Sequence, residues 1–154
     1  MVAGIAENKP AIGAAKTEYK IEQLESKGTD MNERLNQFNN QLFLNLETYR
    51  KTGEALQTPV WFVEENNILY LRSIIKSGKV KRIRNNPDVK VACCEADGRI
   101  IGQWLEGHAR LIADPSEAVR IEKIFDAKYG ETKKGIDEQR KAQGLAYATI
   151  AIEV

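Results

Sequence analysis

The chain has 154 residues, of which 42% are apolar and 29% charged, and its formal net charge is +1. This length corresponds to about one domain, and the composition is that of an ordinary folded protein, neither disordered nor membrane-embedded. No apolar run approaches the roughly 20 residues that span a bilayer, and the near-neutral charge gives no global reason to expect a nucleic-acid partner.

The first 30 residues differ from the rest of the chain. They are rich in Ala, Gly, Lys and Glu, with one weak amphipathic patch around Tyr19 and Leu24. We expect an N-terminal arm or short helix, mobile or loosely attached, over residues 1–30 and a single folded domain over residues 31–154. Thr29 or Asp30 is a suitable cap for a helix from Met31 to about Phe38.

From Gln41 onward the apolar residues mostly alternate with polar ones, which is the period of a β-strand. Tight-turn sequences such as Asn66-Asn67 separate the strands, and Pro115 and Gly130 bound a helix. The pattern predicts strands over residues 41–49, 58–64, 68–73, 89–95, 99–113 and 147–154, the fifth with a break near Gly107. It predicts helices over 79–85 and 115–129, followed by a polar, helical stretch to 144. Antiparallel strands with helices around them indicate a mainly β protein, a closed or nearly closed barrel.

The cysteine and histidine content excludes several kinds of site. Cys93 and Cys94 are adjacent, so they suit two small buried apolar positions in a reducing compartment better than a disulfide, and the cytoplasm follows as the expected location. His108 is the single histidine. No metal-ligand spacing and no Walker or Rossmann glycine loop is present, so we expect no metal site.

The segment with the clearest chemistry is Ser77-Gly78-Lys79, placed where a strand has ended and a helix begins. The start of a helix offers unpaired backbone N–H groups and a partial positive charge, which favour a bound anion such as phosphate. Two other interpretations of the basic stretch 76–84 remain: a solvated helix face, or a patch for nucleic acid or an acidic partner. Nucleic acid is disfavoured because no aromatic residues are interleaved with these charges.

Residues 70–87 (YLRSIIKSGKVKRIRNNP), with 58–62 (TPVWF) before them and 104–111 (WLEGHARL) after them, resemble the pyridoxamine 5′-phosphate oxidase-like, flavin-binding split barrels. The resemblance covers about residues 40–154 and is nearest to the deazaflavin (coenzyme F-420)-dependent branch. It implies a six-stranded antiparallel split β-barrel of Greek-key type with short peripheral helices. It also implies a homodimer with a deazaflavin or FMN at the interface.

The resemblance further implies which residues bind this cofactor. The serine and lysine at Ser77 and Lys79 contact the phosphate, and the strand at Pro59 lies along the ring. The full set of implied cofactor-binding residues is Thr58, Pro59, Val60, Trp61, Arg72, Ser73, Ser77, Gly78 and Lys79.

Two departures argue against vitamin B6 oxidation. The C-terminus lacks the Arg-Leu ending of those oxidases, and Gln103 lies one position out of register with their motif. The resemblance therefore implies an oxidoreductase that transfers hydride to or from a small organic substrate, with no catalytic residue assignable. The alternatives are a non-enzymatic flavin- or haem-binding module on the same fold, and a binder of nucleic acid or an acidic partner through the basic stretch 76–84.

Overall fold

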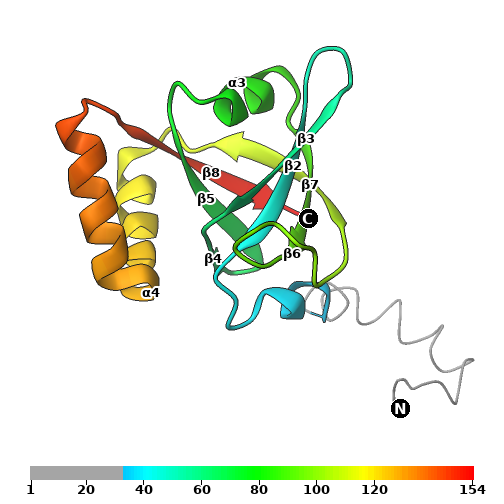
Figure 1. Cartoon of the computed structure of the whole chain (residues 1–154), viewed down its shortest axis with the longest axis horizontal. Coiled ribbons are helices and arrows are strands. Elements are labelled where there is room, and N and C mark those ends of the chain that lie inside the picture. The colour runs from blue at the N-terminus through cyan, green and yellow to red at the C-terminus, as the bar shows by residue number, and fades with distance from the viewer. Residues whose placement is uncertain (1–32) are drawn as a thin grey trace, which may run out of the picture. The chain divides into compact units, whose positions relative to one another are not determined.

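The computed structural model describes residues 33–154, and the predicted N-terminal arm lies outside the described residues. Seven antiparallel strands form one sheet with the order β3-β2-β6-β7-β8-β5-β4, which curls around a central core (Figure 1). The strands are β2 (Leu44–Tyr49), β3 (Ala55–Val60), β4 (Phe62–Glu65), β5 (Ile68–Ile74), β6 (Asp88–Cys93), β7 (Leu105–Leu111) and β8 (Tyr147–Glu153). The helical elements that lie wholly within the described residues are the 3₁₀ turn η1 (Asn36–Phe38) and the helices α3 (Gly78–Asn85) and α4 (Pro115–Ala142).

The sheet closes on itself through a bend at Trp61. This residue alone separates β3 from β4, and these two strands are the two ends of the strand order. β3 pairs with β2, so that Val60 lies opposite Leu44, whereas β4 pairs with β5 and Phe62 lies opposite Leu71. The predicted split barrel is therefore confirmed, but it has seven strands and not six, because the strand expected over residues 58–64 breaks at Trp61.

The long strand expected over residues 99–113 is shorter than predicted. Only Leu105–Leu111 belongs to the ladder, and residues 99–104 contribute a single bridge, between Cys94 and Ile100. The expected break near Gly107 is absent, since Gly107 pairs with Val89 in an unbroken register. Glycine is required there for close packing: a Cβ atom would lie 2.9 Å from a methyl group of Ile152 on β8.

The core consists of aliphatic and aromatic side chains from all around the barrel. Cys93 and Cys94 are buried and unpaired, as expected for two small apolar positions. Burial is the main cause that raises the pKa of Cys94 to about 11, so its thiol is protonated at neutral pH. The largest fully buried side chains are Phe62, Phe125, Leu35, Leu44, Leu46, Leu69, Leu71, Ile121, Ile150 and Ile152.

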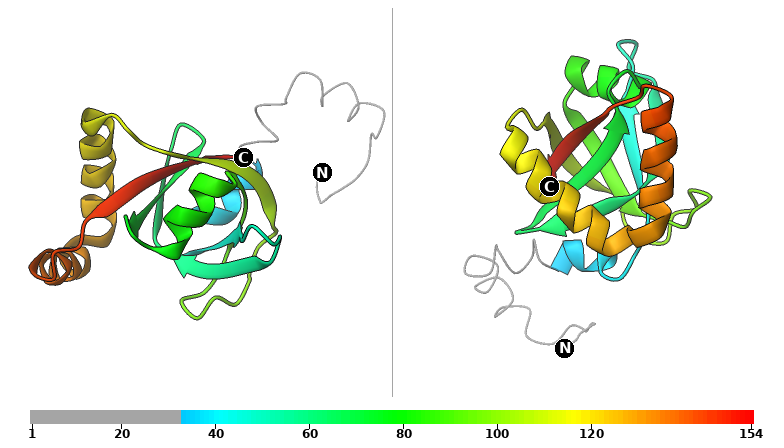
Figure 2. Two further views of the ribbon diagram at one scale, coloured as in Figure 1. Left: turned by 90° about the horizontal axis from the view of Figure 1, so that it is seen from above. Right: turned by 90° about the vertical axis from the view of Figure 1, so that its left-hand side faces the viewer.

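α4 is two helical segments joined by a bend at Gly130, where φ is 55° and ψ is −132°. Figure 2 shows the two halves meeting at this bend beside the barrel. In the first half Ile121 and Phe125 are fully buried against the sheet. Val119, in the same half, is 55% exposed. In the described part of the chain, no helix is both long and apolar enough to cross a membrane.

Candidate functional site

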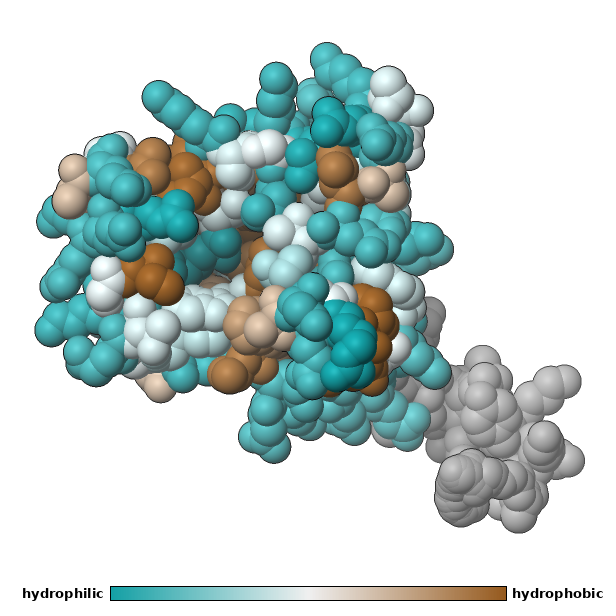
Figure 3. All heavy atoms as spheres, in the orientation of Figure 1, coloured by the Kyte–Doolittle hydropathy of each residue, from teal (hydrophilic) through white to brown (hydrophobic). Residues whose placement is uncertain are grey.

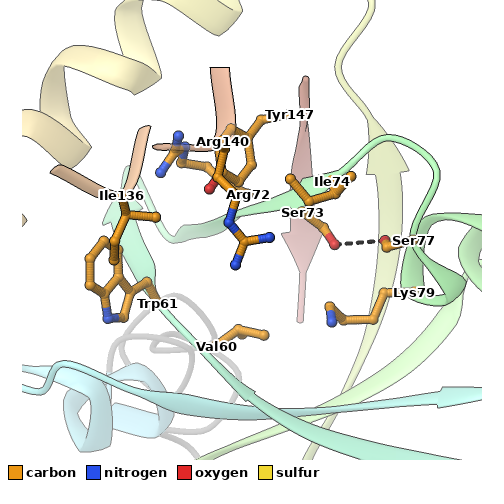
Figure 4. Close-up of a pocket in the computed structure, with 10 residues that line it drawn as sticks. All are labelled: Val60, Trp61, Arg72, Ser73, Ile74, Ser77, Lys79, Ile136, Arg140 and Tyr147. Carbon is orange, nitrogen blue, oxygen red and sulfur yellow. Dashed lines mark hydrogen bonds between the residues drawn. The ribbon is translucent and has the colours of Figure 1, made fainter. Parts of the chain in front are cut away.

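A cavity of about 420 Å³ lies between the barrel and the second half of α4. The molecular surface is hollowed between α4 and the strands (Figure 3). Ten residues line the cavity, and they come from the β3–β4 bend, the end of β5, the start of α3, the end of α4 and the start of β8 (Figure 4). They are Val60, Trp61, Arg72, Ser73, Ile74, Ser77, Lys79, Ile136, Arg140 and Tyr147.

The first turn of α3 forms one side of the cavity. Ser77 is the N-cap residue, and its Oγ accepts a hydrogen bond from the N–H of Val80 at 3.4 Å. The hydroxyl groups of Ser73 and Ser77 lie 2.8 Å apart and share a hydrogen bond (Figure 4). The first N–H groups of a helix have no partner within it, so this corner offers hydrogen-bond donors and a partial positive charge.

Lys79 brings a full positive charge to the same corner. Its side chain is partly buried, and burial is the main cause that lowers the pKa of Lys79, with the charge of Arg82 adding to it. Among the described residues no carboxylate lies within ion-pair distance of its ammonium group. A partly desolvated, unpaired cation favours the binding of an anion.

Arg72 also lies in the cavity wall, but its charge is already balanced. Its Nε lies 2.8 Å from Oε1 of Glu122, and its Nη2 donates a hydrogen bond of 2.7 Å to Oδ1 of Asp137. The guanidinium also stacks on the ring of Tyr147, 3.8 Å from the centroid. We therefore interpret Arg72 as a link between β5 and both halves of α4, whereas the family resemblance implied a role at the cofactor phosphate.

Lys133 completes this ionic cluster from the second half of α4. Its ammonium group lies 2.6 Å from Asp126, 2.7 Å from Asp137 and 3.1 Å from Glu122. The side chain is only 5% exposed, so its charge needs these partners. Because Glu122 and Asp126 belong to the first half of α4, the cluster fixes the fold-back of the helix at Gly130.

The rest of the cavity wall is apolar and aromatic. Trp61 is stacked on Tyr129, with 4.2 Å between the ring centroids and an angle of 11°. The side chains of Val60, Ile74 and Ile136 also face the cavity (Figure 4). Aromatic and aliphatic walls that meet a cationic, donor-rich corner suit a planar molecule carrying an anionic group.

The cavity contains six of the nine residues implied as cofactor-binding: Val60, Trp61, Arg72, Ser73, Ser77 and Lys79. Thr58, Pro59 and Gly78 are not among the residues that line it. Their proposed contacts with a cofactor stay predictions.

Sequence reasoning missed the contribution of α4 and β8. Arg140 and Ile136 lie in the stretch predicted only as polar and helical, and Tyr147 begins a strand expected for its structural role alone. Arg140 brings a second unpaired cation beside Lys79, since within residues 33–154 it has no carboxylate partner. The alternation and charge of residues 131–147 carry no signal for this placement, because it depends on the bend at Gly130.

Comparison with known proteins agrees with this fold. The family described as pyridoxamine 5′-phosphate oxidase matches residues 31–153. The chain belongs to this family. No curated protein matches the chain.

Several solved structures share the split barrel of this family. The heme storage protein HutZ of Vibrio cholerae is 14% identical, with a TM-score of 0.59, and the match covers 84% of this chain and 89% of that one. The conserved hypothetical protein Rv2991 of Mycobacterium tuberculosis is 19% identical, with a TM-score of 0.59 and coverage of 78% and 77%. A FAD-binding protein of Mesorhizobium loti is 18% identical, with a TM-score of 0.53 and coverage of 82% and 87%. At these identities the likeness concerns the fold.

Proposed function

We propose that the protein binds a flavin-type cofactor, FMN or the deazaflavin coenzyme F-420, in the cavity between the barrel and α4. The observation that carries this proposal is the unpaired Lys79 beside Ser73 and Ser77 at the start of α3, facing a cavity with aromatic walls. Membership of a family of flavin-type oxidases and the FAD-binding protein of the same fold support it.

The residues present fit such a cofactor at both of its ends. Ser77 and Lys79, with the first N–H groups of α3, would hold the phosphate. Trp61 and Tyr147 offer flat surfaces, and Val60 and Ile74 an apolar wall, for the ring. A volume of about 420 Å³ lies within the range of roughly 300–1,000 Å³ that is usual for small-molecule sites.

We propose further that the protein is an oxidoreductase acting on a small organic molecule. The bound ring supplies the hydride chemistry, whereas the chain supplies position, electrostatics and exclusion of water. Arg72 and Lys133 hold the second half of α4 over the cavity and thereby keep Ile136 at its wall. Arg140 adds a cation that can orient an anionic group of the cofactor or the substrate.

We propose that the active protein is a homodimer with the cofactor between its two copies, as the family resemblance implies. Exposed apolar side chains such as Ile75, next to the α3 corner, and Ile101 are available for such an interface. We do not propose vitamin B6 oxidation, because Gln103 lies one position out of register with the motif of those enzymes.

A non-enzymatic flavin-binding module is the second candidate. It is favoured by one observation: no carboxylate, histidine or cysteine is among the ten residues that line the cavity, so no carboxylate, imidazole or thiol faces it as an acid or base. A haem-binding module is less well supported, since the lining lacks a histidine, cysteine or methionine as iron ligand and its one tyrosine, Tyr147, has Arg72 stacked on its ring. Reduction of the loaded protein by dithionite, followed by reoxidation with candidate substrates, distinguishes an enzyme from a module.

Replacement of Lys79 tests the site itself. We expect Lys79→Ala to weaken the binding of FMN or coenzyme F-420 by about 1–3 kcal/mol, the usual scale for a lost charge-assisted hydrogen bond. Lys76→Ala is the matched control, since Lys76 is exposed and does not line the cavity. Titration calorimetry with each cofactor measures the effect, and an absorbance spectrum with mass spectrometry of the purified protein identifies the ring system. Equal affinities of the two variants would contradict the site.

A further inference from the structure

A second, smaller pocket of about 330 Å³ lies beside α3, and it shares no lining residue with the first cavity. Gly78, Lys81, Arg82 and Asn85 come from one face of α3, because their spacing matches the helical period. Arg50 and Lys51 come from the turn between β2 and β3. Four of the six lining residues are thus cations, and none is a carboxylate.

Arg82 is held in place at the centre of this group. Its Nε donates a hydrogen bond of 2.7 Å to Oγ1 of Thr48, a side chain that is 1% exposed. Gly78 makes room for the guanidinium, since a Cβ atom at this position would lie 2.6 Å from Nη1 of Arg82. The guanidinium is therefore fixed against the first turn of α3, unlike the mobile side chains of a solvated helix face.

The charges of this pocket are poorly compensated. Burial is the main cause that lowers the pKa of Arg82, and the positive charge of Arg50 lowers it further. Within the described residues, Glu54 is the one carboxylate paired with any of these four cations, and its bridge to Arg50 is exposed on both sides. An exposed bridge of this kind is weak and does not neutralise the group. Like charges gathered in this way favour an anion as ligand.

We propose that this pocket is a second oxyanion site, which binds the phosphate or diphosphate group of a small molecule. The fork of a guanidinium matches the oxygen atoms of phosphate, and Lys51 and Lys81 add charge at the rim. A nucleic acid is disfavoured as the ligand, since the lining has no aromatic ring on which a base could stack. The site is independent of the flavin-type cofactor proposed for the first cavity.

Binding of inorganic pyrophosphate to the full-length protein tests this site. We expect titration calorimetry to show a site, besides any binding in the first cavity, whose affinity falls about tenfold or more in Arg82→Gln, as expected for the loss of a charge-assisted contact. Lys81→Gln removes an exposed charge whose side chain makes no hydrogen bond or ion pair within residues 33–154. Weaker binding in this variant would therefore show that the effect of Arg82→Gln is not misfolding. Gly78→Ala should also weaken binding, because its methyl group displaces Arg82.

Two control variants distinguish this pocket from the first cavity and from a general loss of positive charge. Lys76→Gln carries the same charge change outside the pocket and should not change the affinity of this site, whereas Lys79→Ala should affect only binding in the first cavity. An equal loss in Lys76→Gln and Lys81→Gln, or no binding at all, would overturn the proposal. Tighter, steeply salt-dependent binding of a single-stranded oligonucleotide would overturn it in favour of a nucleic-acid surface. Loss in Lys79→Ala but not in Arg82→Gln would place the anion in the first cavity instead.

Discussion

Two lysines show how the surroundings of a buried charge separate a binding role from a structural one. Burial lowers the pKa of both Lys79 and Lys128, in the latter case to about 8. Lys128 donates a hydrogen bond of 2.8 Å to the carbonyl oxygen of Phe62 and lies 3.7 Å from the centroid of the Phe62 ring. Its partners are therefore supplied by the chain, whereas Lys79 has no anionic partner among the residues that the structure describes and faces a cavity.

The lowered pKa of Lys128 predicts a distinct pH dependence of stability. Between about pH 8 and 10.5 the unfolded lysine holds a proton that the folded one has lost, so a rise in pH favours the folded state. We expect the free energy of unfolding of the wild type to rise by about 1–2 kcal/mol relative to Lys128→Met across this window, a value reduced for the partial exposure of the side chain. Urea unfolding at several pH values measures it.

Lys123→Met is the control for this prediction, since Lys123 is an exposed residue of the same helix. The difference in free energy of unfolding between the wild type and Lys123→Met should change much less with pH than the difference between the wild type and Lys128→Met. Parallel curves for the wild type and Lys128→Met would mean that the ammonium of Lys128 is not desolvated in the folded protein.

At the scale of single elements, α4 owes its shape to one glycine and one ionic cluster. Gly130 reverses the chain with backbone angles that side chains rarely adopt, and no atom lies within 4 Å of where its Cβ would be. Arg72 and Lys133 then tie the two halves to each other and to β5. The position of Ile136 and Arg140 at the cavity depends on both features.

A pair of glycine replacements in α4 separates the effect of the Gly130 backbone conformation on stability from the general effect of replacing glycine by alanine in this helix. We expect Gly130→Ala to lower the free energy of unfolding by about 1–3 kcal/mol, since only the strained φ and ψ oppose the methyl group. Gly135→Ala is the matched control: Gly135 lies within the helix, also in open space, and its replacement should stabilise the protein by about 0.5–1 kcal/mol. Chemical denaturation measures both, and effects of the same sign would contradict the role of Gly130 in the bend.

Local signals predicted a large part of the elements and one corner of the candidate site. The alternation of residues predicted the strands, and the strand-turn-helix pattern placed Ser77 and Lys79 together at the start of α3. The break at Trp61 was missed because it arises from closure of the barrel, where one segment must pair with both β2 and β5. The partners of Arg72 were missed because Glu122 and Asp137 are distant in sequence and meet it only after α4 folds back.

At the scale of the whole molecule, the candidate site connects parts of the chain that are far apart in sequence. Its walls come from residues 60–61, 72–79 and 136–147, so that the barrel, α3 and the fold-back of α4 must all form before the cavity exists. A ligand that binds only this assembled state stabilises the entire domain by mass action. Binding can therefore be followed through global unfolding.

We expect saturating FMN or coenzyme F-420 to raise the midpoint of thermal unfolding. At a ligand concentration of 100 times Kd the added stability is about 2.7 kcal/mol, and Lys79→Ala should lose most of this shift at the same concentration. If the cofactor lies between two copies of the chain, the midpoint of the loaded protein must also rise with protein concentration, because unfolding then includes dissociation. Light scattering on the same samples should give twice the monomer mass of 17.3 kDa. The result could also be a monomer whose midpoint of thermal unfolding rises with cofactor concentration but not with protein concentration. This would support the cavity as the binding site and contradict the proposal that a second copy of the chain contributes to it.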